Sequence, residues 1–303
     1  MRTIGIIANL DKPKACAVQE RLQFLLNSQG IHTVCVEIRK DLASHGNTLQ
    51  PLAAAEMVFV LGGDGTLLGV ARHLARWNVP LLGINVGHLG FLSEAEPTDI
   101  DETVRRVSER EYDLERRMML EVDVYRHGRR IEQLIGLNDA GIGKGSFARM
   151  VSVDVRVDGV LLDAYSGDGV IVSTPTGSTA YSLSCGGPIV APQLQAMLIT
   201  PICPHTLSAR PCVISDTQEV SLVVHATHED LGLTVDGQIG VRLQPEDEVK
   251  VRKAQVVTTL VKWRDREFFS VLRQKLHGQD ASAHHDGGRE STGGTELAAR
   301  TDG

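Results

Sequence analysis

The segment that most constrains the fold is residues 57–66, where an unbroken apolar run ends at three glycines around one acid, Asp64. The run is short and partly β-branched or aromatic, which predicts a strand buried on both faces of a sheet. The glycines let the backbone turn sharply and approach a ligand closely. Helical spacing follows in residues 66–75, with Thr66 as the expected N-cap. The segment predicts a strand, a glycine turn and a helix.

This turn predicts a phosphate site with an added chemical group. In α/β proteins, the amides of such a turn and the N-terminus of the next helix face an anion. A carboxylate repels phosphate, so we interpret Asp64 as a base or a metal partner placed beside phosphates. The glycine spacing fits neither the G-x-G-x-x-G fingerprint nor, around Lys144, a Walker P-loop. A purely structural tight turn stays open as the alternative.

The first hundred residues alternate short apolar runs with helical patterns. The expected strands are residues 3–8, 32–38, 57–61 and 80–84, and residues 16–28 are an expected helix. Such alternation predicts a parallel sheet with helices on both faces. Ligands of these sheets bind at the carboxyl ends of the strands, where the glycine-rich turns 62–65 and 83–91 fall.

From about residue 116 the pattern changes to period-two alternation, for example in residues 119–125, 151–157 and 220–224. We therefore expect four parts, which are an α/β domain over 1–115, a β-rich domain over 116–262, a helix over 263–277 and a tail over 278–303. The apolar stripe of the helix predicts packing on the first domain. The tail has almost no large apolar residues, which predicts disorder.

Composition and charge exclude several classes of protein. The 303 residues are 42% hydrophobic and 23% charged, as in an ordinary folded protein. The net charge of −7 argues against nucleic acid as the main partner. No apolar run approaches the ~20 residues of a bilayer span, so no membrane partner is expected. The five cysteines lack a C-x-x-C pair, which suits free thiols in a cytoplasmic protein and disfavours a zinc site.

Two further segments are candidates for ligand contacts. Residues 165–182 are crowded with small residues and hydroxyls, which can cradle a polyphosphate without charge. A serine-rich loop is the alternative, and no G-x-S-x-G elbow supports serine hydrolysis. Asn138 and Asp139 either form a turn or read the hydroxyls and base of a nucleotide, and both interpretations stay open.

Taken together, these motifs resemble those of the bacterial NAD kinases, the ATP-NAD kinase family. The matching segments follow the family's order and spacing from about residue 2 to residue 276, and they are Gly62-Gly63-Asp64-Gly65-Thr66, Gly87-His88-Leu89-Gly90-Phe91-Leu92, Asn138-Asp139, Thr174-Pro175-Thr176-Gly177-Ser178-Thr179-Ala180-Tyr181 and Asp236-Gly237-Gln238. The Thr-Pro-Thr-Gly-Ser-Thr-Ala-Tyr string is highly specific. The Gly-Gly-Asp-Gly core is shared with diacylglycerol, sphingosine and phosphofructo-kinases.

The resemblance implies a Rossmann-like α/β N-terminal domain and an all-β, β-sandwich-like C-terminal domain. It implies transfer of the γ-phosphoryl group of ATP to the 2′-hydroxyl of the adenosine ribose of NAD, which produces NADP. We expect Mg²⁺ or another divalent cation, because the candidate loops carry few cations for a bound triphosphate. Family members are commonly homodimers or homotetramers.

By position, the resemblance implies that Asp64 is the general base. The implied nucleotide contacts are Asp64, Gly65, His88, Asn138, Asp139, Arg149, Ser166, Asp168, Thr179, Ala180, Tyr181, Ser182, Leu183, Ser184 and Gln238. Ser166 stands where some relatives carry a basic residue, so Arg149 or Lys144 would have to supply that charge. The sequence does not identify the residues that hold the metal.

Two other functions stay open. A lipid or sugar kinase would share the glycine turn, but the hydroxyl string and the segment 236–238 count against it. A non-catalytic NAD(P)-binding sensor could use the same scaffold, but the retention of Asp64 counts against it. Polyphosphate in place of ATP, and NADH in place of NAD, are also left open.

Overall fold

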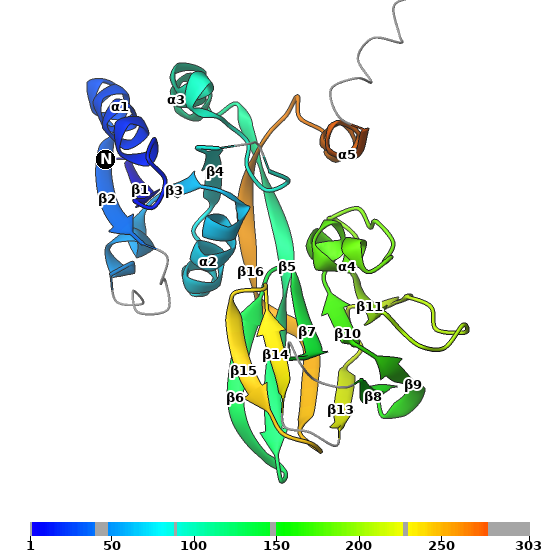
Figure 1. The fold of residues 1–303 in the computed structure, drawn as a ribbon. Coiled ribbons are helices and arrows are strands. Elements are labelled where there is room, and N and C mark those ends of the chain that lie inside the picture. Colours follow the sequence, from blue (N-terminus) through cyan, green and yellow to red (C-terminus); the bar gives the residue numbers. More distant parts are fainter. Residues whose placement is uncertain (1, 40–47, 88–89, 146–149, 227–229, 278–303) are drawn as a thin grey trace, which may run out of the picture. The chain divides into compact units, whose positions relative to one another are not determined.

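The computed structural model describes residues 2–39, 48–87, 90–145, 150–226 and 230–277 (Figure 1). The chain divides into two compact units, Met1–Asp265 and Arg266–Gly303. The predicted tail over 278–303 lies outside the described residues. The second unit contains the expected C-terminal helix, α5 (Phe268–His277), whose packing on the first domain stays a prediction.

The first part of the chain forms a parallel sheet in the order β2–β1–β3–β4. Its strands are β1 (Thr3–Asn9), β2 (His32–Ile38), β3 (Met57–Gly62) and β4 (Leu81–Asn85). These bounds agree with the expected strands to within one residue at each end. Every residue of β3 is buried, as the unbroken apolar run predicts for a central strand.

Helices cover both faces of this sheet, which confirms the prediction from the alternating pattern. They are α1 (Ala15–Ser28), α2 (Asp64–Leu74) and α3 (Ile100–Glu109), with short 3-10 turns η2 (Gln50–Ala54), η3 (Ala75–Trp77) and η4 (Pro97–Asp99). Leu22 of α1 and Val104 of α3 share a core with Phe59. Leu67 of α2 shares the opposite core with Val58, because successive residues of a strand point to opposite faces.

The second part of the chain is built from strands, as its period-two pattern predicts. One antiparallel sheet has six strands in the order β12–β11–β10–β7–β14–β15. They are β7 (Asp139–Lys144), β10 (Gly169–Ser173), β11 (Ala196–Ile202), β12 (Cys212–Ser215), β14 (Leu231–Val235) and β15 (Ile239–Leu243). Two helical turns, η5 (Thr176–Thr179) and α4 (Tyr181–Ser184), follow β10.

A second layer of strands shares a core with this sheet. Its members are β5 (Tyr112–Arg126), β6 (Arg129–Gly136), β8 (Val151–Val157), β9 (Val160–Gly167), β13 (Val220–His225) and β16 (Glu248–Trp263). Val122 and Val153 from this layer belong to one core with Ile142 and Val172 of the six-stranded sheet. The two layers form the expected β-sandwich-like domain.

The long strand β16 connects the two parts of the first unit. It pairs with β5 along most of its length and with β4 through Leu260 and Leu81, so the sheets are continuous. The expected helix over 263–277 begins too early, because Val261 and Trp263 still alternate inward as strand residues. The helix itself begins at Phe268.

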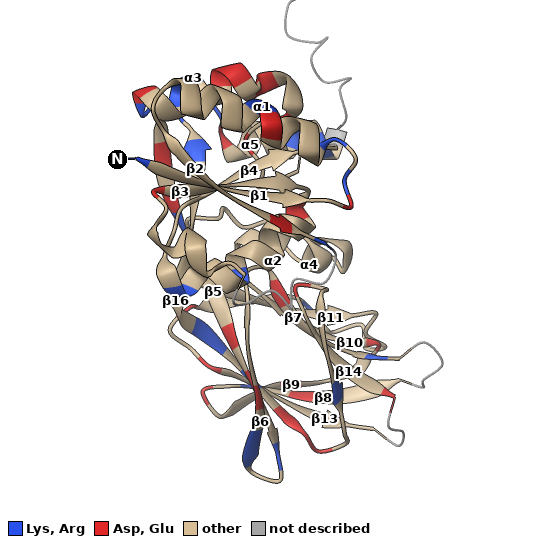
Figure 2. Cartoon of the chain, turned by 90° about the vertical axis from the view of Figure 1, so that its left-hand side faces the viewer, with Lys and Arg blue, Asp and Glu red and all other residues tan. Residues whose placement is uncertain are grey.

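Helix α3 carries several acidic and basic residues (Figure 2). Its exposed Glu102 forms ion pairs with both Arg105 and Arg106. Such exposed pairs contribute little stability each. Within the described part of the chain, no helix combines the length and apolar character that a membrane span requires.

Candidate functional site

Three motifs of the second domain meet at one end of the six-stranded sheet. β7 begins at Asp139, β10 ends at Ser173 and β14 ends at Val235. In the antiparallel register Asp139 pairs with Ser173, and Ala140 pairs with Val235. The register therefore brings the turn at residue 138 beside the hydroxyl segment and the segment 236–238.

The carboxylate of Asp236 holds the turn that carries Asn138 and Asp139. It accepts hydrogen bonds from the amides of Leu137, Asn138 and Asp139 at 3.0, 2.7 and 3.3 Å. Asp236 has a φ of 53°, a left-handed conformation that Asp tolerates better than most residues. Because its side chain is fully buried, Asp236 acts as a fixed acceptor for these amides.

Arg72 of α2 reaches the same carboxylate from the first domain. Its Nη1 lies 2.7 Å from Oδ2 of Asp236, and its Nη2 donates to Oε1 of Gln238 at 2.6 Å. The Nε2 of Gln238 in turn donates to the carbonyl oxygen of Gly65 at 2.7 Å. The turn containing Asp64 is thus bonded to the second domain, and the amide of Gln238 is engaged by protein atoms.

Asp64 is the first residue of α2 and is half-buried. Its Oδ2 accepts the amide of Phe91 at 2.8 Å, and its Oδ1 accepts the hydroxyl of Ser93 at 3.2 Å. A Cβ atom on Gly90 would lie 2.0 Å from Oδ1 of Asp64, so the second glycine turn needs a glycine at this close approach. The two glycine turns therefore pack on one another around this carboxylate.

The predicted N-cap of α2 is wrong. The N-cap is Gly63 in an extended conformation, and no side chain caps the helix. Thr66 is instead buried in the first turn, where its Oγ1 accepts from Asn9 at 2.9 Å. Amides at the N-terminal end of α2 therefore lack an intrahelical partner and can bind an anion.

The hydroxyl segment is folded inward. The hydroxyl of Thr174 donates to the carbonyl of Leu137 at 2.6 Å, and that of Ser178 donates to Pro175 at 2.7 Å. The hydroxyl of Ser182 lies 2.8 Å from that of Thr200. Buried hydroxyls require such partners. The hydroxyls of Thr174, Ser178 and Ser182 therefore bond to protein atoms and shape the loop, whereas the hydroxyl of Ser173 is buried without a partner among the described residues. The role of this segment as a polyphosphate cradle stays a prediction.

Solvent can reach part of residues 179–184, which come after Thr174 and Ser178 in the chain. Thr179, Ala180 and Leu183 are half-buried, while Tyr181 and Ser184 are exposed. These side chains lie where a ligand could reach them, although Ser182 between them is fully buried.

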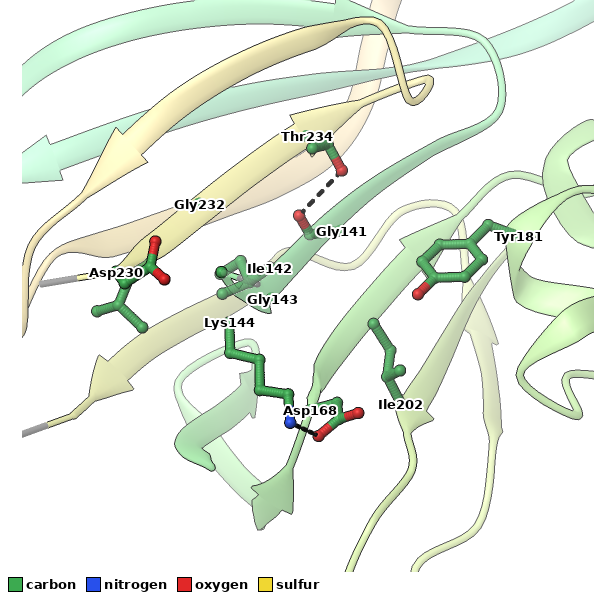
Figure 3. Close-up of a pocket in the computed structure, with 12 residues that line it drawn as sticks. Gly141, Ile142, Gly143, Lys144, Asp168, Tyr181, Ile202, Asp230, Gly232 and Thr234 are labelled. Atoms are coloured by element: carbon green, nitrogen blue, oxygen red, sulfur yellow. Dashed lines mark hydrogen bonds and ion pairs between the residues drawn. The ribbon is translucent and has the colours of Figure 1, made fainter. Parts of the chain in front are cut away.

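A cavity of about 410 Å³ lies along β7 and β14 (Figure 3). Its floor includes the alternate glycines Gly141 and Gly143 of β7 and Gly232, which pairs with Gly143, so this part of the sheet face carries few side chains. Tyr181 lines one wall. Lys144 and Asp168 line another and form an ion pair at 2.7 Å. This volume suits part of a small-molecule ligand.

The sequence pointed to only some of these residues. The sequence indicates Lys144 as a source of positive charge, and the family resemblance implies a contact for Asp168, whereas neither points to the cavity residue Asp230. The alternation of glycines over residues 141–145 was the available signal for a bare strand face. Ser166 is half-buried, and its carbonyl accepts the amide of His205. His88 and Arg149 lie outside the described residues.

Asp139 is the titratable group of the site with the largest environmental effect. Its side chain is 5% exposed, and no hydrogen-bond partner of its carboxylate is found among the described residues. Burial, and then the nearby charge of Asp236, raise the pKa of Asp139 from 3.8 to about 7. The folded protein therefore retains a proton on Asp139 that the unfolded chain loses at lower pH.

Asp139→Asn is expected to change how stability depends on pH. The pKa of Asp139 is raised on folding. The contribution of this carboxyl group to the free energy of unfolding is therefore fully present below about pH 4, and it is lost as pH rises through about 7. As the pH is raised from 5 to 8, the free energy of unfolding of the variant should rise by roughly 2–3 kcal/mol relative to that of the wild type. Urea unfolding of both proteins at the two pH values measures this. A difference independent of pH would contradict the assignment.

Among the described residues, no group of three or more His, Cys, Asp or Glu side chains is arranged to hold a metal ion. The carboxylate of Asp64 is the acid that stands at the glycine turn. Mg²⁺ is commonly bound by one or two carboxylates together with substrate phosphates, so this donor set fits an ion carried largely by a phosphate ligand.

Family models match both parts of the chain. One described as the ATP-NAD kinase N-terminal domain matches residues 4–112, and one described as the ATP-NAD kinase C-terminal domain matches residues 137–263. The NAD kinase of Moorella thermoacetica is 44% identical over 280 residues, which cover 91% of this chain and 89% of that protein.

Two solved structures are similar to this fold. Yeast NADH kinase complexed with NADH has a TM-score of 0.80 at 23% identity, over 93% of this chain and 89% of that chain. An NAD kinase from Archaeoglobus fulgidus in complex with ATP has a TM-score of 0.72 at 25% identity, over 91% of this chain and 99% of that chain. The first of these likenesses concerns the fold alone.

Proposed function

Since the chain belongs to the ATP-NAD kinase family, we propose that it transfers the γ-phosphoryl group of ATP to the 2′-hydroxyl of the adenosine ribose of NAD and so produces NADP. One observation carries the proposal. A half-buried carboxylate in a glycine turn, Asp64, is bonded through the residues around it to the turn of Asn138 and Asp139. A base and an acceptor-binding turn are the two parts that this reaction requires.

Asp64 would act as the general base. Phosphoryl transfer passes through a loose transition state, so the protein contributes mainly position and charge. The amide of Phe91 and the hydroxyl of Ser93 fix the orientation of the carboxylate while leaving further lone pairs for a substrate hydroxyl. Such a base acts late in the reaction, when the proton of the alcohol becomes acidic.

The acceptor dinucleotide would bind against the second domain. The side-chain amide of Asn138 is half-buried, and the described residues give it no hydrogen-bond partner, so it can bind a base or a ribose. The exposed ring of Tyr181 offers a stacking surface beside the glycine-floored cavity. Of the other expected contacts, Asp168 lines this cavity, and Gln238 is hydrogen-bonded to the carbonyl oxygen of Gly65.

Mg²⁺ would be held by phosphate oxygens together with Asp64, and when bound it supplies positive charge to the transferring phosphoryl group.

We also propose a homodimer or homotetramer. The five cysteines are free thiols, which supports a reducing compartment such as the cytoplasm.

The direct test is to incubate the purified protein with ATP, Mg²⁺ and NAD and to measure NADP with an NADP-specific dehydrogenase. Formation of NADP is expected. Parallel reactions with diacylglycerol, sphingosine and a sugar phosphate test the other kinases, and polyphosphate and NADH test the donor and acceptor range. Binding of NAD without any phosphoryl transfer would favour a sensor instead.

Asn138→Ala is expected to raise the KM for NAD more than the KM for ATP. Loss of one well-placed hydrogen bond corresponds to roughly 1–3 kcal/mol of acceptor binding. The fold should be retained, because the backbone amide of Asn138, not its side chain, binds Asp236. Steady-state kinetics with each substrate varied in turn measure the effect, and equal changes in both KM values would contradict the assignment.

A further inference from the structure

We propose that Arg72 is a positioning residue that keeps the Asp64 turn and the Asn138–Asp139 turn in one fixed arrangement. The inference deepens the proposed function and rests on it, because it concerns how the two halves of that site are aligned. It is carried by an unbroken set of hydrogen bonds that crosses from the first domain to the second.

The link begins on the helix that also carries the catalytic carboxylate. Arg72 lies eight residues after Asp64 on α2, which is about two helical turns. A helix is rigid over two turns, so a displacement of Arg72 also displaces the turn at Asp64. The side chain of Arg72 is 10% exposed and that of Asp236 is fully buried, so the ion pair between them is shielded from water.

The link ends at the acceptor turn. The carboxylate that Arg72 binds also accepts three amides of residues 137–139. Any movement of Asp236 therefore moves the backbone of Asn138 and Asp139. A second branch returns to the start, because Gln238 accepts from Arg72 and donates to the carbonyl of Gly65. Arg72, Gln238 and Gly65 thus form a ring of contacts that closes along α2, and Asp236 joins Arg72 to the acceptor turn.

Energetics favour a positioning role over a stabilising one. Two buried charges lose hydration, and apolar residues of similar volume can stabilise a protein equally well. In some proteins a buried pair specifies one defined geometry, and we assign that role to Arg72 and Asp236. The planar guanidinium serves two acceptors through two different nitrogens, which the single ammonium group of lysine does not reproduce.

Arg72→Lys tests the proposal, because it retains the positive charge but lacks the two guanidinium nitrogens that donate to Asp236 and Gln238. We expect a kcat for NADP formation lowered roughly 10- to 100-fold, as for a small misplacement of reacting groups, with a smaller change in the KM for ATP. Arg76→Ala is the matched control, since Arg76 is an exposed arginine just after α2 that stacks on Trp77. The control should have the kcat of the wild type.

Hydrogen exchange separates positioning from general loss of structure. In Arg72→Lys and in Arg72→Met, the amides of residues 137–139 should exchange faster, while the exchange of the buried strand β3 should stay that of the wild type. Wild-type exchange at residues 137–139 in both variants would overturn the proposal, as would an unchanged kcat. If the wild type itself forms no NADP, the proposed function fails, and the exchange data still decide whether Arg72 holds the turn.

Discussion

Asp64→Asn is expected to lose roughly 10²–10⁴ in kcat for NADP formation, the range for removal of a general base. The amide is nearly isosteric with the carboxylate but accepts no proton at neutral pH. The KM values should change much less, because the substrates are bound mainly by other groups. Steady-state rates at saturating ATP and NAD measure the loss directly.

The fold of Asp64→Asn should be retained for a specific reason. The carboxylate accepts from the amide of Phe91 and from the hydroxyl of Ser93. In the variant, the side-chain oxygen can accept from Phe91, and the new NH₂ group can donate to the Ser93 hydroxyl, which rotates to accept. Thermal unfolding should therefore occur close to the wild-type Tm.

A control for that experiment is Asp101→Asn, which removes an exposed carboxylate paired with Arg21. It should leave kcat unchanged and alter the Tm very little, because surface pairs contribute little. If Asp64→Asn retained wild-type kcat, Asp64 would have no part in the chemistry.

The local architecture was predictable because its determinants are local. The apolar run of β3 and the glycines after it indicate a central strand and a turn within ten residues. Alternation of strands and helices then implies a parallel sheet covered on both faces, as the cores around Leu22 and Leu67 confirm. Period-two segments such as β8 gave their bounds directly.

The contacts between distant segments were not predictable from pattern. Arg72 and Asp236 are 164 residues apart, and an arginine on a helix carries no mark of its partner. The inward turn of Thr174 and Ser178 was missed for a related reason. A run of hydroxyls has the same composition whether it faces a ligand or its own backbone, and only the packing of β7 against β10 decides between them.

The same packing supports a second large effect, because Gly177→Ala is expected to damage both stability and activity. A Cβ atom at residue 177 would lie 2.1 Å from the carbonyl oxygen of Asn138 and 2.8 Å from its Cα. These are backbone atoms of a turn that Asp236 holds through three amides, so they cannot move aside cheaply. Overpacking of this kind costs typically about 1–3 kcal/mol or more.

Gly177→Ala should also lose activity, because relief of the clash moves Asn138 away from the acceptor. We expect a loss of roughly 10²-fold or more in kcat/KM for NAD, as for an ångström-scale misplacement. Gly240→Ala is the matched control, since a Cβ atom there meets nothing within 4 Å. Urea unfolding and kinetics on both variants test this. A Gly177→Ala protein as stable and active as Gly240→Ala would mean that the hydroxyl segment does not press on the acceptor turn in solution.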